Sequence, residues 1–316
     1  MVIKPRHLIQ TFTISLNQKH VLKTLLYFDV FNYPLKFTEV LENMPVAISE
    51  EDLRHELQSL IEEDFIKEEQ GFYLLSTSSG NCIARRLKGN NEALETMTRA
   101  YSYSKKIASF PFISGVCISG GLSKNYYDEH SDIDYFVITK ANRLWLCRTL
   151  FVLYYKTLSE KEKNNYCLNY YISEADLLIP DKNDFVATEL AYLLPTVNYP
   201  VYKRILKENN WYKTKFLNKG ELPDLNCIEA PVPWFKKIVE FVFEGKFGNW
   251  VDNQLLYITL KHWQKKYPEL SREDFDLQFR SRKHVCKYHS KGHQNKVLTL
   301  WDEKIKNFAN QFQIEL

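Results

Sequence analysis

Two aspartates that follow a pair of glycines give this chain the makings of a metal-dependent phosphate site. Residues 119–124 read Ser-Gly-Gly-Leu-Ser-Lys, and after a short polar stretch Asp132 and Asp134 flank Ile133. Because side chains alternate along a strand, we expect both carboxylates on one side, about 7 Å apart at the backbone, with Ile133 in the core. Such a pair can share Mg²⁺, which completes its coordination with water and substrate phosphate.

The glycine turn supplies a complementary anion site. Gly120 and Gly121 lack side chains, so their backbone N–H groups can close around a triphosphate, and a helix starting near Leu122 would add its positive end. Ser123 and Lys124 add a hydroxyl and a cation. Taken singly, a glycine pair is an ordinary turn and Asp-x-Asp an ordinary strand edge. Their order and separation favour the site.

This segment resembles the nucleotidyltransferase superfamily typified by DNA polymerase beta. The family signature is a hydrophobic-Gly-(Gly/Ser) turn followed by Asp-hydrophobic-(Asp/Glu), which Gly120, Gly121, Asp132 and Asp134 match. Residues 83–300 are also similar to uncharacterised bacterial nucleotidyltransferase-domain proteins, through the stretches 131–134, 143–148, 167–173 and 188–191. The resemblance implies magnesium-dependent transfer of a nucleoside monophosphate from a nucleoside triphosphate to a hydroxyl acceptor, with one or two Mg²⁺ ions held by the aspartates.

One position departs from the family pattern. Active members usually carry a third carboxylate on a later strand, and the corresponding strand here, 167–173, offers Asn169. An amide can orient a hydroxyl but cannot take its proton, although Glu174 and Asp176 lie just beyond. We therefore retain a second hypothesis, a nucleotide-binding regulatory or scaffold protein with little or no transfer activity.

A basic stretch near the C-terminus is a further candidate. Residues 279–291 combine Arg, Lys and His with aromatic residues, a composition suited either to a phosphate-binding groove or to a solvated basic face. If the chain is a nucleotidyltransferase, Lys287 and His289 are the candidates for contact with the triphosphate or the acceptor.

Three domains are expected from the pattern along the chain: a winged-helix-like domain over 1–80, a mixed-sheet nucleotidyltransferase core over 81–180 and a mostly helical domain over 181–316. The overall class is α+β. Residues 1–80 contain seven Lys or Arg against twelve Asp or Glu, and the acids crowd the expected third helix and the wing. Because that face would repel phosphates, we do not expect it to bind DNA, and transcriptional regulation is a weaker hypothesis.

Composition points to a cytoplasmic protein. The chain has no charged-then-apolar leader, and its best apolar stretch, 144–158, is too short to span a bilayer and contains Arg148 and Lys156. The six cysteines form no Cys-x-x-Cys pair and are expected to be free thiols. The expected partners are a nucleoside triphosphate and an unknown acceptor, without a membrane.

Overall fold

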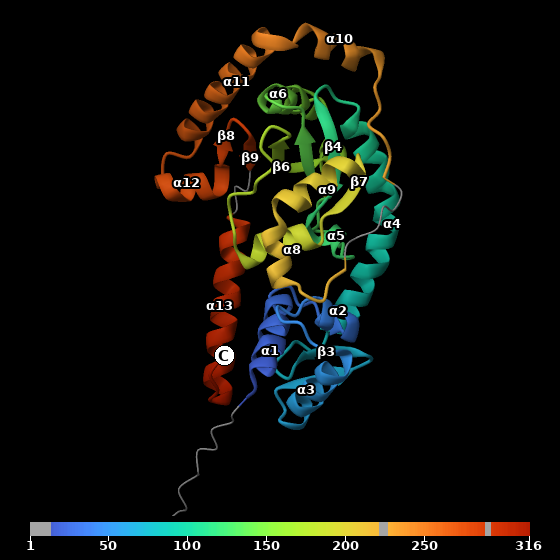
Figure 1. Cartoon of the computed structure of the whole chain (residues 1–316), viewed down its shortest axis with the longest axis vertical. Coiled ribbons are helices and arrows are strands. Elements are labelled where there is room, and N and C mark those ends of the chain that lie inside the picture. The colour runs from blue at the N-terminus through green and yellow to red at the C-terminus, as the bar shows by residue number, and fades with distance from the viewer. Residues whose placement is uncertain (1–13, 221–226, 288–291) are drawn as a thin grey trace, which may run out of the picture. The chain divides into compact units, whose positions relative to one another are not determined.

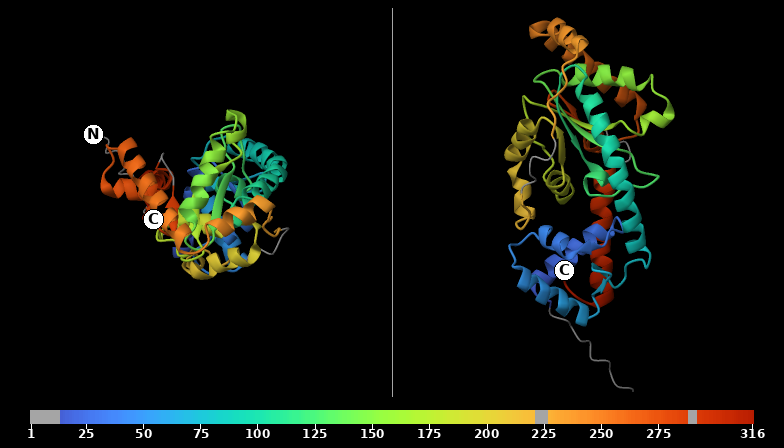
Figure 2. Two further views of the ribbon diagram at one scale, coloured as in Figure 1. Left: turned by 90° about the horizontal axis from the view of Figure 1, so that it is seen from above. Right: turned by 90° about the vertical axis from the view of Figure 1, so that its right-hand side faces the viewer.

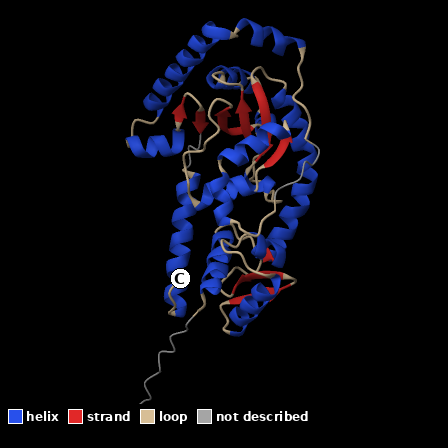
Figure 3. Cartoon of the chain, viewed as in Figure 1, coloured by secondary structure: helices blue, strands red, loops and turns tan. Residues whose placement is uncertain are grey.

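The computed structural model of the chain describes residues 14–220, 227–287 and 292–316. The chain forms two compact units, the first from residues 1–86, 214–220 and 295–316 and the second from 87–213 and 221–294. Helices are combined with one antiparallel and one mixed sheet, which confirms the α+β class (Figures 1 and 3).

The first unit places three helices against a small sheet of strand order β1-β3-β2. Ser49 caps its third helix by accepting from the Asp52 N–H at 3.0 Å, and Gln70 and Gly71, both at positive φ, turn the expected hairpin. Both features were predicted from the sequence and are confirmed. The elements are α1 (Leu16–Asp29), β1 (Leu35–Lys36), α2 (Phe37–Glu42), α3 (Glu50–Glu62), β2 (Ile66–Glu69) and β3 (Phe72–Leu75).

The last helix, α13 (His293–Phe312), completes this first unit from the other end of the chain. The Trp301 indole N–H donates to the Lys23 carbonyl at 3.0 Å, and the Phe312 ring packs edge-on against Phe65 with centroids 5.1 Å apart. The expected C-terminal domain over 181–316 therefore differs from the observed units. The expectation rested on order along the sequence, which contains no information about the distant packing partner of this helix.

The second unit is built on a sheet of strand order β7-β4-β5-β6-β9-β8, in which only β5 and β6 are parallel. Its strands are β4 (Ile113–Ile118), β5 (Asp134–Thr139), β6 (Cys167–Ser173), β7 (Leu194–Val197), β8 (Ser281–Arg282) and β9 (Val285–Lys287). Its helices are α4 (Cys82–Ala108, which begins in the first unit), α5 (Gly120–Ser123), α6 (Leu144–Tyr155), α7 (Glu160–Lys163), α8 (Asp184–Ala191), α9 (Tyr199–Glu208), the 3-10 helix η1 (Asn210–Lys215), α10 (Trp234–Val242), α11 (Gly245–Lys266) and α12 (Arg272–Phe279).

Alternation along β5 determines which side chains can reach the site. The Tyr135 hydroxyl donates to the Ala100 carbonyl of α4 at 3.1 Å, whereas Ile138 lies toward Val201 of α9 across Gly115. Helices α4 and α9 thus cover opposite faces of the sheet (Figure 2). Asp134 and Ile138 are four residues apart on the strand, so their side chains lie on the same face. That face is the one covered by α8 and α9.

After Pro180 the described chain is mostly helical, as expected, but three short strands that were not expected lie among the helices. The stretch 194–197 forms β7, whose Pro195 is tolerated because β7 is an edge strand, and β8 and β9 extend the opposite side of the sheet. These strands are too short to show a period of two in the sequence. Within the described residues, a search for helices able to span a bilayer finds none.

Candidate active site

The glycine turn joins β4 to the start of β5 through one residue that only glycine can occupy. Gly120 has φ +67°, and a Cβ built there would lie 2.3 Å from Asp134 Oδ2. The Ser119 N–H donates to the Asp134 carbonyl at 3.0 Å, which holds turn and strand together. The helix expected near Leu122 exists but is only the four-residue α5, so its macrodipole is small.

Asp134 and Asn169 are brought together, as their positions on neighbouring strands predicted. Asn169 Nδ2 donates to Asp134 Oδ1 at 2.9 Å and contacts Cys167 Sγ at 3.0 Å. The pairing of β5 with β6 shifts by one residue at this point, because Tyr135 pairs with Leu168 and the next residue pairs with Tyr170. The irregularity leaves Asn169 unpaired in the ladder and available to the aspartate.

The Asp134 carboxyl lies in a strongly perturbed environment. Burial raises its pKa to about 7, the charges of Glu189 and Asp132 add to this effect, and the Cys167 hydrogen bond and the Lys124 ammonium oppose it. A desolvated carboxylate near two other acids is energetically costly in its ionised form, and a bound cation would remove that cost.

Asp132 differs from the expectation in its local structure. Strand β5 begins only at Asp134, so Asp132 lies in the preceding coil and is exposed. Its charge nevertheless reaches the site, because burial together with the charges of Asp134 and Asp132 raises the pKa of the Cys167 thiol. The charges of both aspartates therefore reach the Cys167 thiol, although Asp134 is half-buried and Asp132 is exposed.

Glu189, from α8, binds two of the protein groups that the sequence predicted to hold a phosphate. Its Oε1 accepts from Lys124 Nζ at 2.7 Å and its Oε2 from the Gly120 N–H at 3.2 Å. Lys124 Nζ and the Ser123 hydroxyl also donate back to the Gly120 carbonyl, each at 3.0 Å. The Glu189 carboxylate thus accepts from two donors, the Lys124 ammonium and the Gly120 N–H, that were expected to hold a triphosphate.

Ionisation of Glu189 is favoured by these contacts. Burial opposes its charge, but the Lys124 ammonium and the Gly120 N–H outweigh burial and hold its pKa below the ordinary value. Sequence reasoning did not assign Glu189 to the site. No local signal marks it, since it follows Lys124 by 65 residues and lies in a helix whose other residues are mostly apolar.

Lys287, a predicted contact of the triphosphate or the acceptor, is not joined to this cluster. Lys287 is buried on β9, donates to Gln294 Oε1 at 2.6 Å and pairs with Asp181 at 3.3 Å. Burial lowers the pKa of Lys287 despite the Asp181 carboxylate. His289 lies outside the described residues.

Acids from other parts of the chain neutralise much of the basic stretch. Arg280 pairs with Asp181 at 2.8 Å, and Lys283 pairs with the fully buried Asp252, also at 2.8 Å. Arg282 pairs with Asp276 of α12 at 2.9 Å. The described residues of the basic stretch therefore form an ion-pair network. Neither of the two alternatives predicted from the sequence, a phosphate-binding groove and a solvated basic face, included these pairs.

The donor set for a metal is small. Among the described residues there is no group of three or more His, Cys, Asp or Glu side chains that could hold a metal ion. Asp132 and Asp134 alone suit an ion that takes its remaining ligands from water and substrate phosphate, as Mg²⁺ commonly does. The two residues therefore fit an ion that takes most of its ligands from elsewhere better than one held by protein side chains alone.

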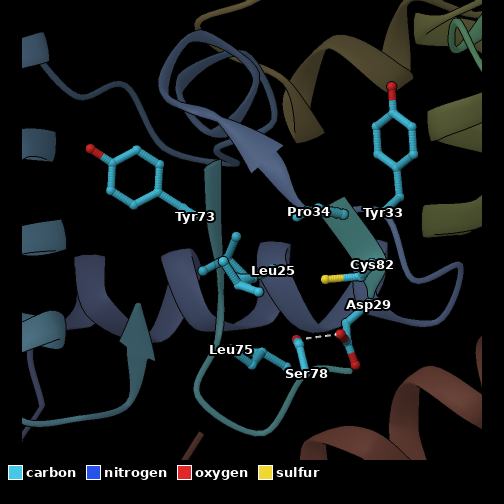
Figure 4. Close-up of a pocket in the computed structure, with 9 residues that line it drawn as sticks. Leu25, Asp29, Tyr33, Pro34, Tyr73, Leu75, Ser78 and Cys82 are labelled. Carbon is cyan, nitrogen blue, oxygen red and sulfur yellow. Dashed lines mark hydrogen bonds between the residues drawn. The ribbon is translucent and has the colours of Figure 1, made fainter. Parts of the chain in front are cut away.

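A small cavity in the first unit does not compete as a site. Its volume of about 10 Å³ is close to the minimum for one water molecule, and Tyr33, Tyr73 and Cys82 help to line it (Figure 4). Its one carboxylate, Asp29, accepts from the Ser78 hydroxyl at 2.6 Å.

Comparison of the chain with models of protein families, with curated proteins and with solved structures gave no match. Function therefore has to be argued from the geometry of the cluster itself, which consists of the glycine turn, two aspartates, Asn169 and Glu189.

Proposed function

We propose that the chain is a magnesium-dependent nucleotidyltransferase that moves a nucleoside monophosphate from a nucleoside triphosphate to a hydroxyl acceptor. The observation that carries the proposal is the packing of Asp134 against Gly120: the half-buried carboxylate lies against the turn whose N–H groups and lysine suit a phosphate. Metal ligands and phosphate donors within one cluster are what transfer at phosphorus requires.

Asp132 and Asp134 are the residues that would hold Mg²⁺. Held there together with the nucleotide, the ion would supply charge stabilisation for transfer at phosphorus. Gly121 and Ser123 complete the turn around the phosphates, while Lys124 changes its partner from Glu189 to the triphosphate. Each of these roles uses a group that already lies at the turn.

Asn169 has an orienting role in this proposal. Its amide donates to Asp134 at 2.9 Å, so it fixes the rotamer of the carboxylate and accepts no proton. The same observation favours the second candidate, a nucleotide-binding regulatory or scaffold protein with little or no transfer, because the position of the usual base is an amide.

An assay for transfer of the nucleoside monophosphate distinguishes the nucleotidyltransferase from the nucleotide-binding regulatory protein. The full-length protein is incubated with Mg²⁺, cell extract and each nucleoside triphosphate labelled at the α-phosphate. The proposal predicts a labelled adduct on some acceptor together with release of pyrophosphate. Reversible binding of every triphosphate without adduct would establish the regulatory candidate instead.

For the first unit we propose a winged-helix-like module that contacts protein rather than DNA. Its element order, three helices interleaved with a three-stranded sheet that ends in a hairpin, supports the comparison. Helix α3 carries Glu50, Glu51 and Asp52 in its first turn, and the hairpin adds Glu68 and Glu69. A duplex would be repelled by this face.

Substitution of Glu189 tests the internal carboxylate. In Glu189→Gln the ammonium of Lys124 loses its charged partner, so we expect inorganic tripolyphosphate to bind on the order of tenfold more tightly without metal. Calorimetry with tripolyphosphate measures this affinity directly.

Glu174→Gln is the matched control for that experiment. Glu174 pairs with Arg204 at 2.8 Å, and its side chain is 26% exposed, the same fraction as for Glu189. The control should leave the affinity unchanged. Equal affinities in both variants and the wild type would show that Glu189 does not compete with phosphate.

A further inference from the structure

Helix α10 buries charged side chains and exposes apolar ones, the reverse of the usual arrangement on a surface helix. Lys236, only 2% exposed, points inward and donates to the carbonyls of Ala108 at 2.8 Å and Ile113 at 3.0 Å. Glu240, one turn later, accepts from the Phe112 N–H at 2.7 Å. The charged side of this helix is thus its packed side, and apolar residues are left facing outward.

Exposed apolar residues occur on this side of α10 and at the start of α11, and we call them together the aromatic face. Trp234 and Phe241 are 74% and 78% exposed, and the rings of Phe247 and Trp250 stack with centroids 6.3 Å apart. The aromatic face consists of Trp234, Ile238, Phe241, Val242, Phe247 and Trp250, each more than half exposed.

The turn between the two helices is held in place. Arg143 donates through Nε to the Phe243 carbonyl and through Nη2 to the Gly245 carbonyl, both at 2.9 Å. Phe243 stacks on Phe247 with centroids 5.7 Å apart, which links the end of one helix to the start of the next. The aromatic face is therefore pre-organised rather than assembled on contact.

Its size matches a protein interface. The six side chains expose on the order of 800 Å², the area that each partner buries in a standard-size interface and more than most monomers leave open. Aromatic residues with few charges at the centre are also the composition of an interface core.

The charges at the border select the partner. Lys237 and Lys246 are exposed there together with Glu244, so both signs are present. A two-fold arrangement can place Glu244 of one copy near Lys246 of the other. We propose that the aromatic face pairs with the same face of a second copy of this chain to form a symmetric dimer.

Sedimentation velocity of the full-length chain tests the proposal. The wild type should sediment at twice the chain mass of 37.5 kDa, and Phe241→Glu combined with Trp250→Glu should sediment at the single-chain mass with an unchanged circular dichroism spectrum. Leu153→Glu on α6 is the control, since Leu153 is 57% exposed but lies outside the aromatic face, and it should remain dimeric.

Several outcomes would overturn the dimer. One is a wild type that sediments at the single-chain mass at every soluble concentration, whether or not it co-sediments with phosphatidylserine vesicles. Another is retention of the doubled mass by the glutamate variant. If that variant fails to fold, Phe241→Ser with Trp250→Ser makes the same test with less disruption, and an undiminished doubled mass would again contradict the proposal.

Discussion

Asp134→Asn is expected to stabilise the folded chain at pH 8 while abolishing magnesium-dependent nucleotide binding. The carboxyl has its pKa raised from 3.8 to about 7, chiefly by burial, so the folded state holds a proton that the unfolded state has released. Between those two values the stability of the wild type falls as pH rises. Above pH 7 the accumulated penalty is on the order of 4 kcal/mol.

The asparagine variant carries no such penalty. Its advantage over the wild type should be near zero at pH 4, should grow through pH 7 and should then level off. Urea denaturation at a series of pH values measures the free energy of unfolding of both proteins. Asp132→Asn is the control, because Asp132 is exposed, and it should show no comparable gain. Parallel pH profiles for wild type and Asp134→Asn would contradict the account of this carboxyl.

Gly120→Ala is expected to have the largest destabilising effect at the turn. The new methyl would lie 2.3 Å from Asp134 Oδ2, in a backbone conformation that a side chain rarely adopts. Strain at positive φ and overpacking should together cost about 3 kcal/mol of folding free energy. Because the carboxylate has to move, nucleotide binding should be lost as well.

Gly245→Ala separates those two contributions. Gly245 has the same φ of +67°, but no atom lies within 4 Å of a Cβ built there. It should lose only the conformational part, about 1 kcal/mol, and keep nucleotide binding. Urea midpoints and nucleotide titrations on both variants make the comparison. Equal losses would show that the close approach of Asp134 to the turn contributes nothing.

The parts of the fold that the sequence predicted are those with local causes. The Ser49 cap, the hairpin at Gly71 and the strand 167–173 each follow from short-range patterns, and the structure places them as expected. The glycine turn and Asp134 also meet as predicted, because a strand, a tight turn and a second strand leave few arrangements.

The parts that could not be predicted depend on partners far away in the sequence. Glu189 reaches Lys124 across 65 residues, and Asp181 reaches Lys287 across 106. Neither ion pair has a spacing in the sequence that identifies it, since an acid on any neighbouring element could have paired with the lysine instead. The same holds for the ring of Phe65, whose partner lies on the last helix. Long-range pairing is determined by the topology of the fold, and the periodicity of the sequence contains no information about it.

Calorimetric titration of nucleoside triphosphates in the presence of Mg²⁺ tests the central claim most directly. The account predicts that the wild type binds a triphosphate more tightly with Mg²⁺ than without it. It also predicts that Asp132→Asn combined with Asp134→Asn abolishes the magnesium-dependent part while the variant remains folded. An affinity that is unchanged in the folded double variant would contradict the assignment of the two aspartates and the glycine turn as a nucleotide site.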